Sequence, residues 1–158
     1  NACPNRQVIS LSGDGGFTMM MGEMLTLKQL NLPIKIFVFN NEELSFIAME
    51  MKASGYLDYA TDFVNPDFGK LAEAAGIKGV SIQNSSEVDE KIMEALNHNG
   101  PVIVNVRVDK QELAMPPKIA YQQAKGFSKY LINAILDGRG TELKEMAKTN
   151  WMKYKSLF

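Results

Sequence analysis

Short apolar runs alternate with segments of helical periodicity along the first two thirds of the chain. Each run is bounded by glycine, proline or asparagine, which favours a buried strand over a helix. Between the runs, apolar residues recur at spacings of three and four, which predicts helices. The predicted strands are residues 7–12, 34–39, 79–83 and 102–108, and the predicted helices are residues 17–30, 65–75 and 86–97, the second of them capped by Asn65 with Pro66 as its first residue.

This alternation of strand and helix predicts an α/β fold with a mainly parallel sheet and helices on both faces. Two more helical stretches follow, at about residues 117–136 and 141–157, and form a C-terminal helical extension over residues 117–158. A chain of 158 residues is the size of one globular domain, so we expect a single domain over residues 1–158.

Charge and cysteine content exclude some classes of function. Seventeen Lys and Arg against eighteen Asp and Glu give a net charge of −1, so we expect no binding to nucleic acid. Cys3 is the one cysteine, and no apolar run approaches the roughly 18 residues that cross a bilayer. These features favour the cytoplasm, and the strand that starts almost at once favours a fragment of a longer protein.

Polar residues follow two consecutive predicted strands. Gly13-Asp14-Gly15-Gly16 ends the first strand and Asn40-Asn41 ends the second. Parallel sheets bind ligands outside the carboxyl ends of their strands, so Asp14 and Asn41 are expected to converge. One carboxylate and one amide oxygen suit Mg²⁺, which takes its remaining ligands from phosphate and water.

The glycines on either side of Asp14 fit a phosphate ligand. They permit close backbone approach, and a helix that starts near Phe17 would offer its N–H groups. A Walker loop needs Lys and then Ser or Thr, which are absent after Gly16, and the dinucleotide fingerprint needs glycine where Thr18 stands. Each of the two motifs is also an ordinary turn composition when taken alone, so the prediction of a magnesium-bridged diphosphate rests on their combination.

The pair GDGG and NN, separated by one helix, resembles the diphosphate-binding motif of thiamine diphosphate enzymes. The segments NNEELSFIAMEMKASGYLDY and PPKIAYQQAKGFSKYLINAILDGRGTELKEMAKTNW resemble pyruvate oxidases, in particular the quinone-reducing pyruvate dehydrogenases of bacteria. This resemblance implies the thiamine diphosphate-binding fold, as the last domain of a three-domain subunit.

The resemblance also implies roles for particular residues. Asp14, the Asn41 side chain and the Glu43 backbone carbonyl would bind the metal, and Phe46 and Glu50 would line the reacting end of the cofactor as candidate catalytic residues. The implied cofactor-binding set is Gly13, Asp14, Gly15, Gly16, Asn41, Glu43 and Leu44.

The implied reaction is the decarboxylation of pyruvate with thiamine diphosphate and Mg²⁺, followed by transfer of two electrons to FAD, which a domain outside this chain would mostly bind. A quinone would accept the electrons and acetate would be released. Three alternatives stay open, namely an oxidase that forms acetyl phosphate, an acetolactate synthase-like enzyme and a non-catalytic module that has lost its cofactor. Ser45 stands where relatives commonly carry glycine, and the glutamate that activates the cofactor lies upstream in this family, so the isolated chain should be inactive.

Two further expectations concern partners. The family forms its active sites between subunits, so we expect a homo-oligomer, a dimer or a tetramer, of the full protein. From Leu143 onward, Met146, Trp151 and other apolar residues share one helical face, with lysines mostly off it. This face either packs on its own domain or makes a peripheral contact with the inner face of the cell membrane.

Overall fold

The computed structural model describes residues 6–110 and 121–155, with side chains as far as Trp151. Cys3, residues 117–120 of the predicted extension and the side chains of Tyr154 and Phe158 lie outside the described residues. The chain divides into two compact units, one of residues 1–42 with 64–108 and the other of residues 43–63 with 109–158.

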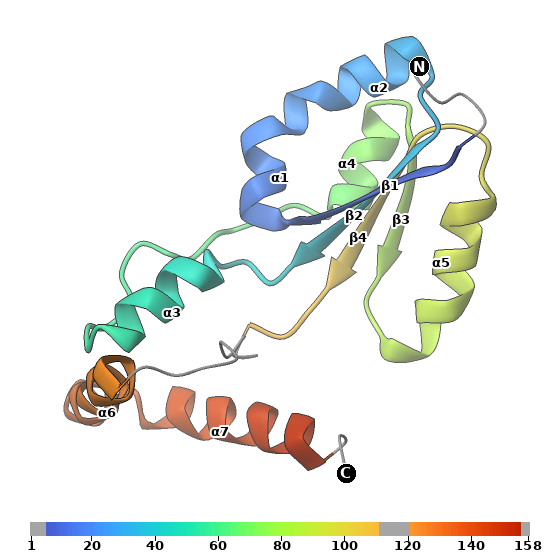
Figure 1. Ribbon diagram of the computed structural model, residues 1–158. Coiled ribbons are helices and arrows are strands. Elements are labelled where there is room, and N and C mark those ends of the chain that lie inside the picture. The colour runs from blue at the N-terminus through green and yellow to red at the C-terminus, as the bar shows by residue number, and fades with distance from the viewer. Residues whose placement is uncertain (1–5, 111–120, 156–158) are drawn as a thin grey trace. The chain divides into compact units, whose positions relative to one another are not determined.

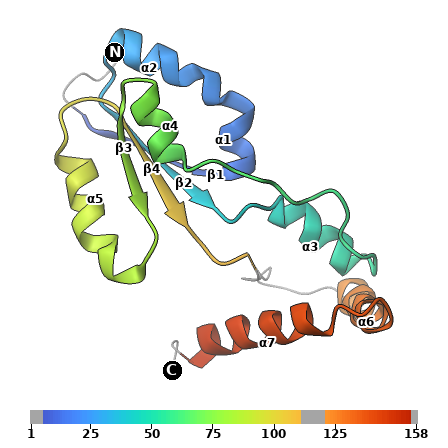
Figure 2. The same cartoon turned by 180° about the vertical axis from the view of Figure 1, so that it is seen from behind.

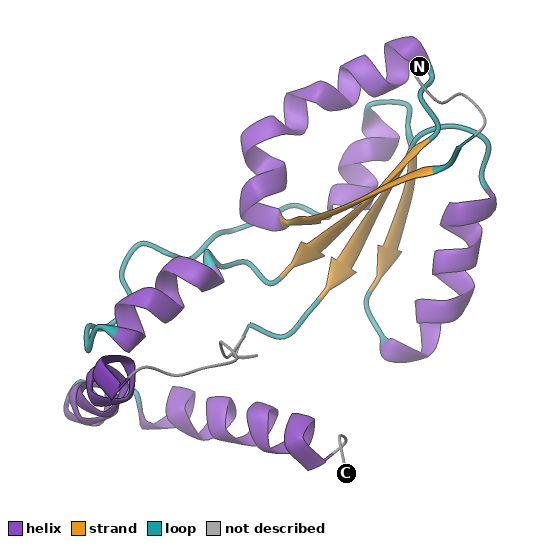
Figure 3. Ribbon diagram, viewed as in Figure 1, coloured by secondary structure: helices purple, strands orange, loops and turns teal. Residues whose placement is uncertain are grey.

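The first unit is built on a four-stranded sheet (Figures 1 and 3). Its strands are β1 (Val8–Gly13), β2 (Ile34–Asn40), β3 (Lys78–Ile82) and β4 (Val102–Arg107). They lie in the order β1-β2-β4-β3, and every neighbouring pair is parallel. The predicted parallel sheet is therefore confirmed. Six of the eight predicted strand ends differ from the observed ones by one residue, and the other two agree.

Helices cover both faces of this sheet, as predicted (Figures 1 and 2). The alternation of β2 separates two cores, because Ile36 and Val38 point to one face and Phe37 to the other. The first core contains residues of α1 (Asp14–Met20), α2 (Met24–Leu30) and α4 (Phe68–Ala74), and the second contains residues of α5 (Val88–Asn97). Phe17 of α1 meets Phe68 of α4 edge to face at 5.1 Å between ring centroids.

Two predicted helix starts were wrong. The helix after β1 begins at Asp14 rather than near Phe17, and a 3₁₀ turn (Met21–Glu23) divides it into α1 and α2. The helix predicted to start at Asn65-Pro66 begins instead after Asp67, whose carboxylate accepts from the backbone N–H groups of Gly69 and Lys70. Asp67 is the N-cap because its side chain reaches these N–H groups, and the Asn65 side chain makes other contacts.

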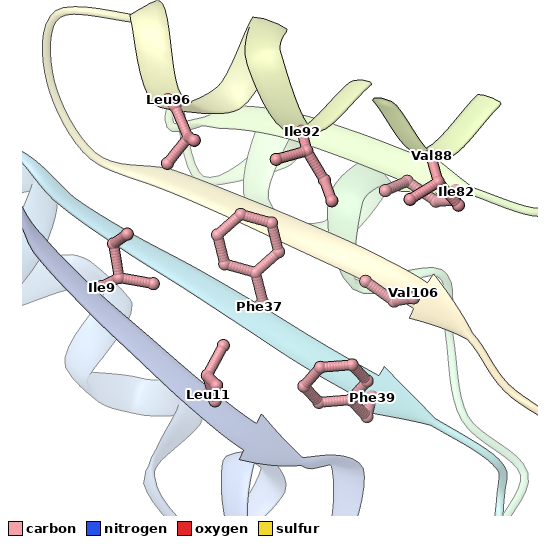
Figure 4. Close-up of a pocket in the computed structure, with 9 residues that line it drawn as sticks. All are labelled: Ile9, Leu11, Phe37, Phe39, Ile82, Val88, Ile92, Leu96 and Val106. Carbon is pink, nitrogen blue, oxygen red and sulfur yellow. The ribbon is translucent and has the colours of Figure 1, made fainter. Parts of the chain in front are cut away.

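One part of the sheet remains uncovered on the α5 side (Figure 4). A groove of about 290 Å³ lies there between α5 and the exposed side chains of β1 and β2. Leu11 of β1 is 70% exposed and Phe39 of β2 is 40% exposed, because α5 packs mainly over β3 and β4 and reaches β2 only at Phe37. The lining is wholly apolar and consists of Ile9, Leu11, Phe37, Phe39, Ile82, Val88, Ile92, Leu96 and Val106.

The second unit contains α3 (Ser45–Ala53), α6 (Tyr121–Leu136) and α7 (Gly140–Lys155). The predicted C-terminal helices thus share a unit with residues 43–63. Tyr130, Ala134 and Met146 form its buried core. Glu142 links the three helices, since it lies 3.4 Å from the Lys52 Nζ of α3 and accepts from the Tyr130 hydroxyl of α6 at 3.2 Å. Burial raises the pKa of Tyr130, so this hydroxyl stays a donor.

The apolar face predicted near the C-terminus is only partly buried in its own unit. Met146 is buried, whereas Ala147 is exposed and Trp151 is 74% exposed. None of the described helices combines the length and apolar character that a membrane span requires.

Candidate functional site

The two predicted motifs meet at one edge of the first unit's sheet. Gly13, the last residue of β1, is in register with Phe39, the residue before the end of β2. Asp14 begins α1 directly after the first strand, and Asn40 closes the second. Residues that are 26 positions apart in the chain therefore end at the same edge, because neighbouring parallel strands share their carboxyl ends.

The Asp14 carboxylate is the centre of this edge. It is only 2% exposed. Its Oδ1 accepts from the Gly15 N–H at 2.9 Å. Its Oδ2 accepts from the Glu42 N–H at 2.8 Å, and Glu42 directly follows Asn41. The turn that contains Asn41 is therefore hydrogen-bonded to Asp14 through Glu42, and the meeting of the Asn41 side chain with Asp14 stays a prediction.

A second donor reaches the same oxygen from a third segment. The Asn65 Nδ2 donates to Asp14 Oδ2 at 2.7 Å and to Asn40 Oδ1 at 3.0 Å. The Asn40 Nδ2 in turn donates to Asn105 Oδ1 of β4 at 3.0 Å. Asn40 and Asn105 are 2% and 3% exposed, whereas Asn65 is half-buried, so the chain of amides runs from the buried strands to the half-buried loop before α4.

The turn after Asn41 is held in an uncommon conformation. Glu42 has a φ of +60°, in the left-handed region that a residue with a side chain seldom adopts. Two contacts fix it, the N–H bond to Asp14 and a 2.8 Å ion pair between its carboxylate and Arg107 at the end of β4. Backbone strain of this kind is concentrated at ligand sites.

The donor set of this edge fits a divalent cation. No Lys, Arg or His lies within ion-pair distance of Asp14 among the residues that the structure describes. A buried carboxylate without a cation is costly. A carboxylate has about four acceptor positions, and three are filled here, which leaves one on Oδ1. Mg²⁺ prefers a hard oxygen of this type.

Histidine and cysteine play no part in this site. The described residues include no group of three His, Cys, Asp or Glu side chains arranged to hold a metal. The ligand set implied by the resemblance has a different composition, with the Asp14 carboxylate, the Asn41 amide and the Glu43 backbone carbonyl. This set is typical of an ion that takes its other ligands from phosphate and water.

The protein itself does not require glycine at positions 13 and 16. Gly13 has φ −71° and ψ 156°, which any residue adopts, and a Cβ built there meets no atom within 4 Å. A Cβ at Gly16 would touch the Ser12 Oγ at an ordinary 3.5 Å. Gly15 is buried, and its N–H donates a hydrogen bond to the Asp14 carboxylate. Open space in front of Gly13 is what close approach of a ligand would need.

The remaining predicted site residues belong to the second unit. Glu43 is 6% exposed and forms an isolated antiparallel bridge with Asp62, and Leu44 donates its N–H to the Thr61 carbonyl at 2.8 Å. Burial raises the pKa of the Glu43 carboxyl, an effect that the positive charges of Lys52 and Lys110 partly offset.

Phe46 and Glu50 lie one helical turn apart in α3 and both are exposed, with Phe46 at 72%. Residues four apart share a helix face, so the two side chains can act on one ligand. Their assignment to the reacting end of the cofactor stays a prediction.

Sequence reasoning included Asn40 in the Asn-Asn motif without giving its side chain a role, and it missed Asn65, Asn105 and Arg107. Of these three, Asn65 carried a local signal, as an asparagine before proline, and that signal was read as a helix cap. The contacts of all four residues are long-range in sequence.

Comparison with known proteins places this geometry in a family. The profile of the family described as thiamine pyrophosphate enzyme, C-terminal TPP binding domain, matches residues 1–106. The chain belongs to this family. Its sheet, its GDGG turn and its Asn-Asn strand end are therefore those of a thiamine diphosphate-binding domain, and the predicted fold is confirmed.

Individual relatives agree with this family. The chain is 38% identical over 146 residues to YdaP of Bacillus subtilis (strain 168), whose name describes a thiamine pyrophosphate-containing protein, and this match covers 92% of the chain and 25% of YdaP. It is 37% identical over 116 residues to the mitochondrial acetolactate synthase catalytic subunit of Saccharomyces cerevisiae and 34% identical over 117 residues to the acetolactate synthase isozyme 2 large subunit of Escherichia coli K12. Each of these two matches covers 73% of the chain, and 17% and 21% of the relative. The chain spans a quarter or less of these relatives.

Proposed function

We propose that this chain holds the diphosphate of thiamine diphosphate through Mg²⁺, as the C-terminal domain of a longer subunit that oxidatively decarboxylates pyruvate. The observation that carries the proposal is the buried Asp14 carboxylate, which has one acceptor position left and no cation beside it among the described residues. Asp14, the Asn41 side chain and the Glu43 carbonyl would hold the ion. The space before Gly13 would admit the diphosphate.

The bound cofactor would supply an electron sink for the carbanion that decarboxylation leaves. The residues of this chain would orient the metal ligands, and the Asp14 carboxylate would neutralise part of the charge of the ion. The N–H of Glu42 and the amide of Asn65 fix the carboxylate, and the ion pair between Glu42 and Arg107 fixes the turn that carries Asn41. Phe46 and Glu50 are proposed to face the reacting end of the cofactor.

The choice of pyruvate oxidation, with FAD and a quinone acceptor and with acetate as product, is supported by the resemblance of residues 40–59 and 116–151 to pyruvate oxidases. The match to YdaP covers 92% of the chain and those to the acetolactate synthases cover 73%, but the name of YdaP states no substrate and so favours neither reaction. The second candidate is an acetolactate synthase-like carboligase, which the names of several relatives favour. An acetyl phosphate-forming oxidase would differ only in its product.

Homo-oligomerisation of the complete protein and a peripheral membrane contact of α7 belong to the same proposal. Trp151 is exposed and available for such a contact. Liposome co-sedimentation of the complete protein, with and without the change Trp151→Ser, tests the membrane contact. Equal sedimentation of both forms would reject it.

The deciding experiment adds pyruvate anaerobically to the complete protein loaded with thiamine diphosphate, Mg²⁺ and FAD. We expect bleaching of the flavin absorbance and release of acetate. Acetolactate without flavin reduction would favour the second candidate instead. Asp14→Ala should abolish the Mg²⁺-dependent binding of thiamine diphosphate measured by calorimetry, and undiminished binding by this variant would reject the metal site.

A further inference from the structure

We propose that Asn65 is a positioning residue that presents the Asp14 carboxylate to the metal. The inference rests on the proposed magnesium site and adds to it a residue from a third segment of the chain. Asn65 lies in the loop before α4, 51 positions after Asp14.

The side-chain NH₂ group of Asn65 donates hydrogen bonds to residues at both strand ends. A side-chain amide nitrogen carries two hydrogens. One is donated to Asp14 Oδ2 at 2.7 Å and the other to Asn40 Oδ1 at 3.0 Å. Asn40 is itself oriented by its bond to Asn105. Rotation of the Asn65 amide would therefore break two hydrogen bonds at once, which favours a single orientation of this amide.

This arrangement determines which oxygen of Asp14 is free. Oδ2 receives two donors, from Glu42 and Asn65, whereas Oδ1 receives one, from Gly15. The terminal torsion of an aspartate is broad and has no strong intrinsic preference. Without Asn65, Oδ2 regains an acceptor position and the carboxylate can turn, so that the oxygen offered to the ion is no longer fixed.

The contact is not needed to start the helix that follows. Asp67 caps α4 through the N–H groups of Gly69 and Lys70. The Asn65 side chain points instead to Asp14 and Asn40. Its role is thus separable from the helix cap, and a loss of metal binding can be distinguished from a loss of α4.

The test compares two ions with different demands on geometry. Mg²⁺ requires near-ideal octahedral ligands, whereas Ca²⁺ tolerates variable ones. The concentration of each ion that gives half-maximal thiamine diphosphate binding is measured on the complete protein and on Asn65→Ala. We expect the Mg²⁺ requirement to rise by about tenfold, the effect typical of one hydrogen bond to a charged group. The Ca²⁺ requirement should rise by no more than about twofold, because that ion adapts to a displaced carboxylate.

Two control variants separate positioning from stability. Asp67→Ala removes the N-cap of α4, which lies outside the amide network, so it should lower the thermal midpoint while the Mg²⁺ requirement stays within about twofold. Asn84→Ala removes a surface hydrogen bond to Glu87 and should change neither quantity.

Three results would overturn the inference. The first is an unchanged Mg²⁺ requirement in Asn65→Ala, and the second is an equal rise for Mg²⁺ and Ca²⁺. The third is an equal rise in Asp67→Ala at the same loss of thermal stability. A wild-type protein that binds thiamine diphosphate without any divalent ion would reject the proposed function itself, and the inference with it.

Discussion

At the scale of single residues, the site is defined by what surrounds one carboxylate. Asp14 is buried and accepts three hydrogen bonds from three separate segments, through Gly15, Glu42 and Asn65. Hydrogen bonds to a charged acceptor are shorter and stronger than neutral ones. The carboxylate is therefore held in position before any ligand arrives, which lowers the entropic cost of binding.

Gly13 offers a direct test of the space reserved for the diphosphate. Gly13→Ala should leave the free energy of unfolding within about 0.5 kcal/mol, because the added methyl meets no protein atom and the backbone conformation is ordinary. Thiamine diphosphate affinity should fall by about tenfold or more, equal to about 1.4 kcal/mol, because the methyl occupies the ligand's space. Calorimetric titration measures the affinity and urea denaturation the stability.

Gly22→Ala is the matched control, since a Cβ at Gly22 also meets nothing within 4 Å but lies in the 3₁₀ turn between α1 and α2. It should change neither quantity. Equal affinities for the two variants would show that the space before Gly13 is not used by the ligand.

Lys35 gives a pH-dependent prediction. Its side chain is 1% exposed and donates to the carbonyls of His98 and Gly100, and burial lowers the pKa of this ammonium group from its ordinary 10.5. The folded chain thus releases the Lys35 proton at a lower pH than the unfolded chain does. Between the lowered pKa and 10.5 the unfolded state binds more protons, so the stability of the folded state rises with pH.

The measurement is the free energy of unfolding of the wild type minus that of Lys35→Met, by urea denaturation at intervals from neutral pH to pH 11. We expect the difference to be flat at low pH and to grow through the window below about 10.5. Lys70→Met, at an exposed position of α4, should show no such growth. A difference that falls with rising pH would contradict the assignment.

At the scale of elements, the strands could be predicted well and the turns poorly. Most residues of β2 and β4 are buried or half-buried, so their apolar runs mark the two strands. The start of α4 was misplaced because Asn65 and Asp67, two residues apart, are both good cap residues, and only the three-dimensional contacts decide between them. The left-handed φ of Glu42 had no signal in the sequence, since glutamate does not favour it.

The same reasoning applies to the site. Asp14 and Asn41 could be predicted because each follows a strand directly, and the order of the strands brings their ends together. Asn65 and Asn105 could not be predicted, because their partners lie 25 to 65 positions away and no periodicity encodes such contacts.

The packing of α3 on α6 gives a prediction for one element pair. A Cβ at Gly126 of α6 would overlap the Ala53 carbonyl at the end of α3. Gly126→Ala should therefore destabilise the second unit by about 1–3 kcal/mol, although the same change at an open helical position is usually favourable. Urea denaturation, followed by circular dichroism, measures this loss.

Gly140 of α7 supplies the comparison, because a Cβ there meets nothing within 4 Å and its φ is not left-handed. Gly140→Ala should gain up to about 1 kcal/mol. If both variants were stabilised, the close contact between α3 and α6 would be refuted.

At the scale of the whole molecule, the chain carries one part of a larger catalytic assembly under our proposal. Asp14 and Asn41 at the sheet edge would provide metal ligands, and the match to YdaP covers 25% of that protein. We predict that the 158-residue chain alone does not turn over pyruvate above a control with thiamine diphosphate and Mg²⁺ only. Carbon dioxide release, measured in parallel for this chain and the complete protein, checks the prediction, and release by the chain alone would refute it.

The division into two units has a genetic consequence. The chain passes from one unit to the other at residues 42–43, 63–64 and 108–109, so each unit is assembled from two separate stretches of the reading frame. No single recombination breakpoint can exchange one unit between related genes and leave the other whole. The turn at Asn41, which we propose binds the metal, and the helix carrying Phe46 and Glu50 should therefore be inherited together.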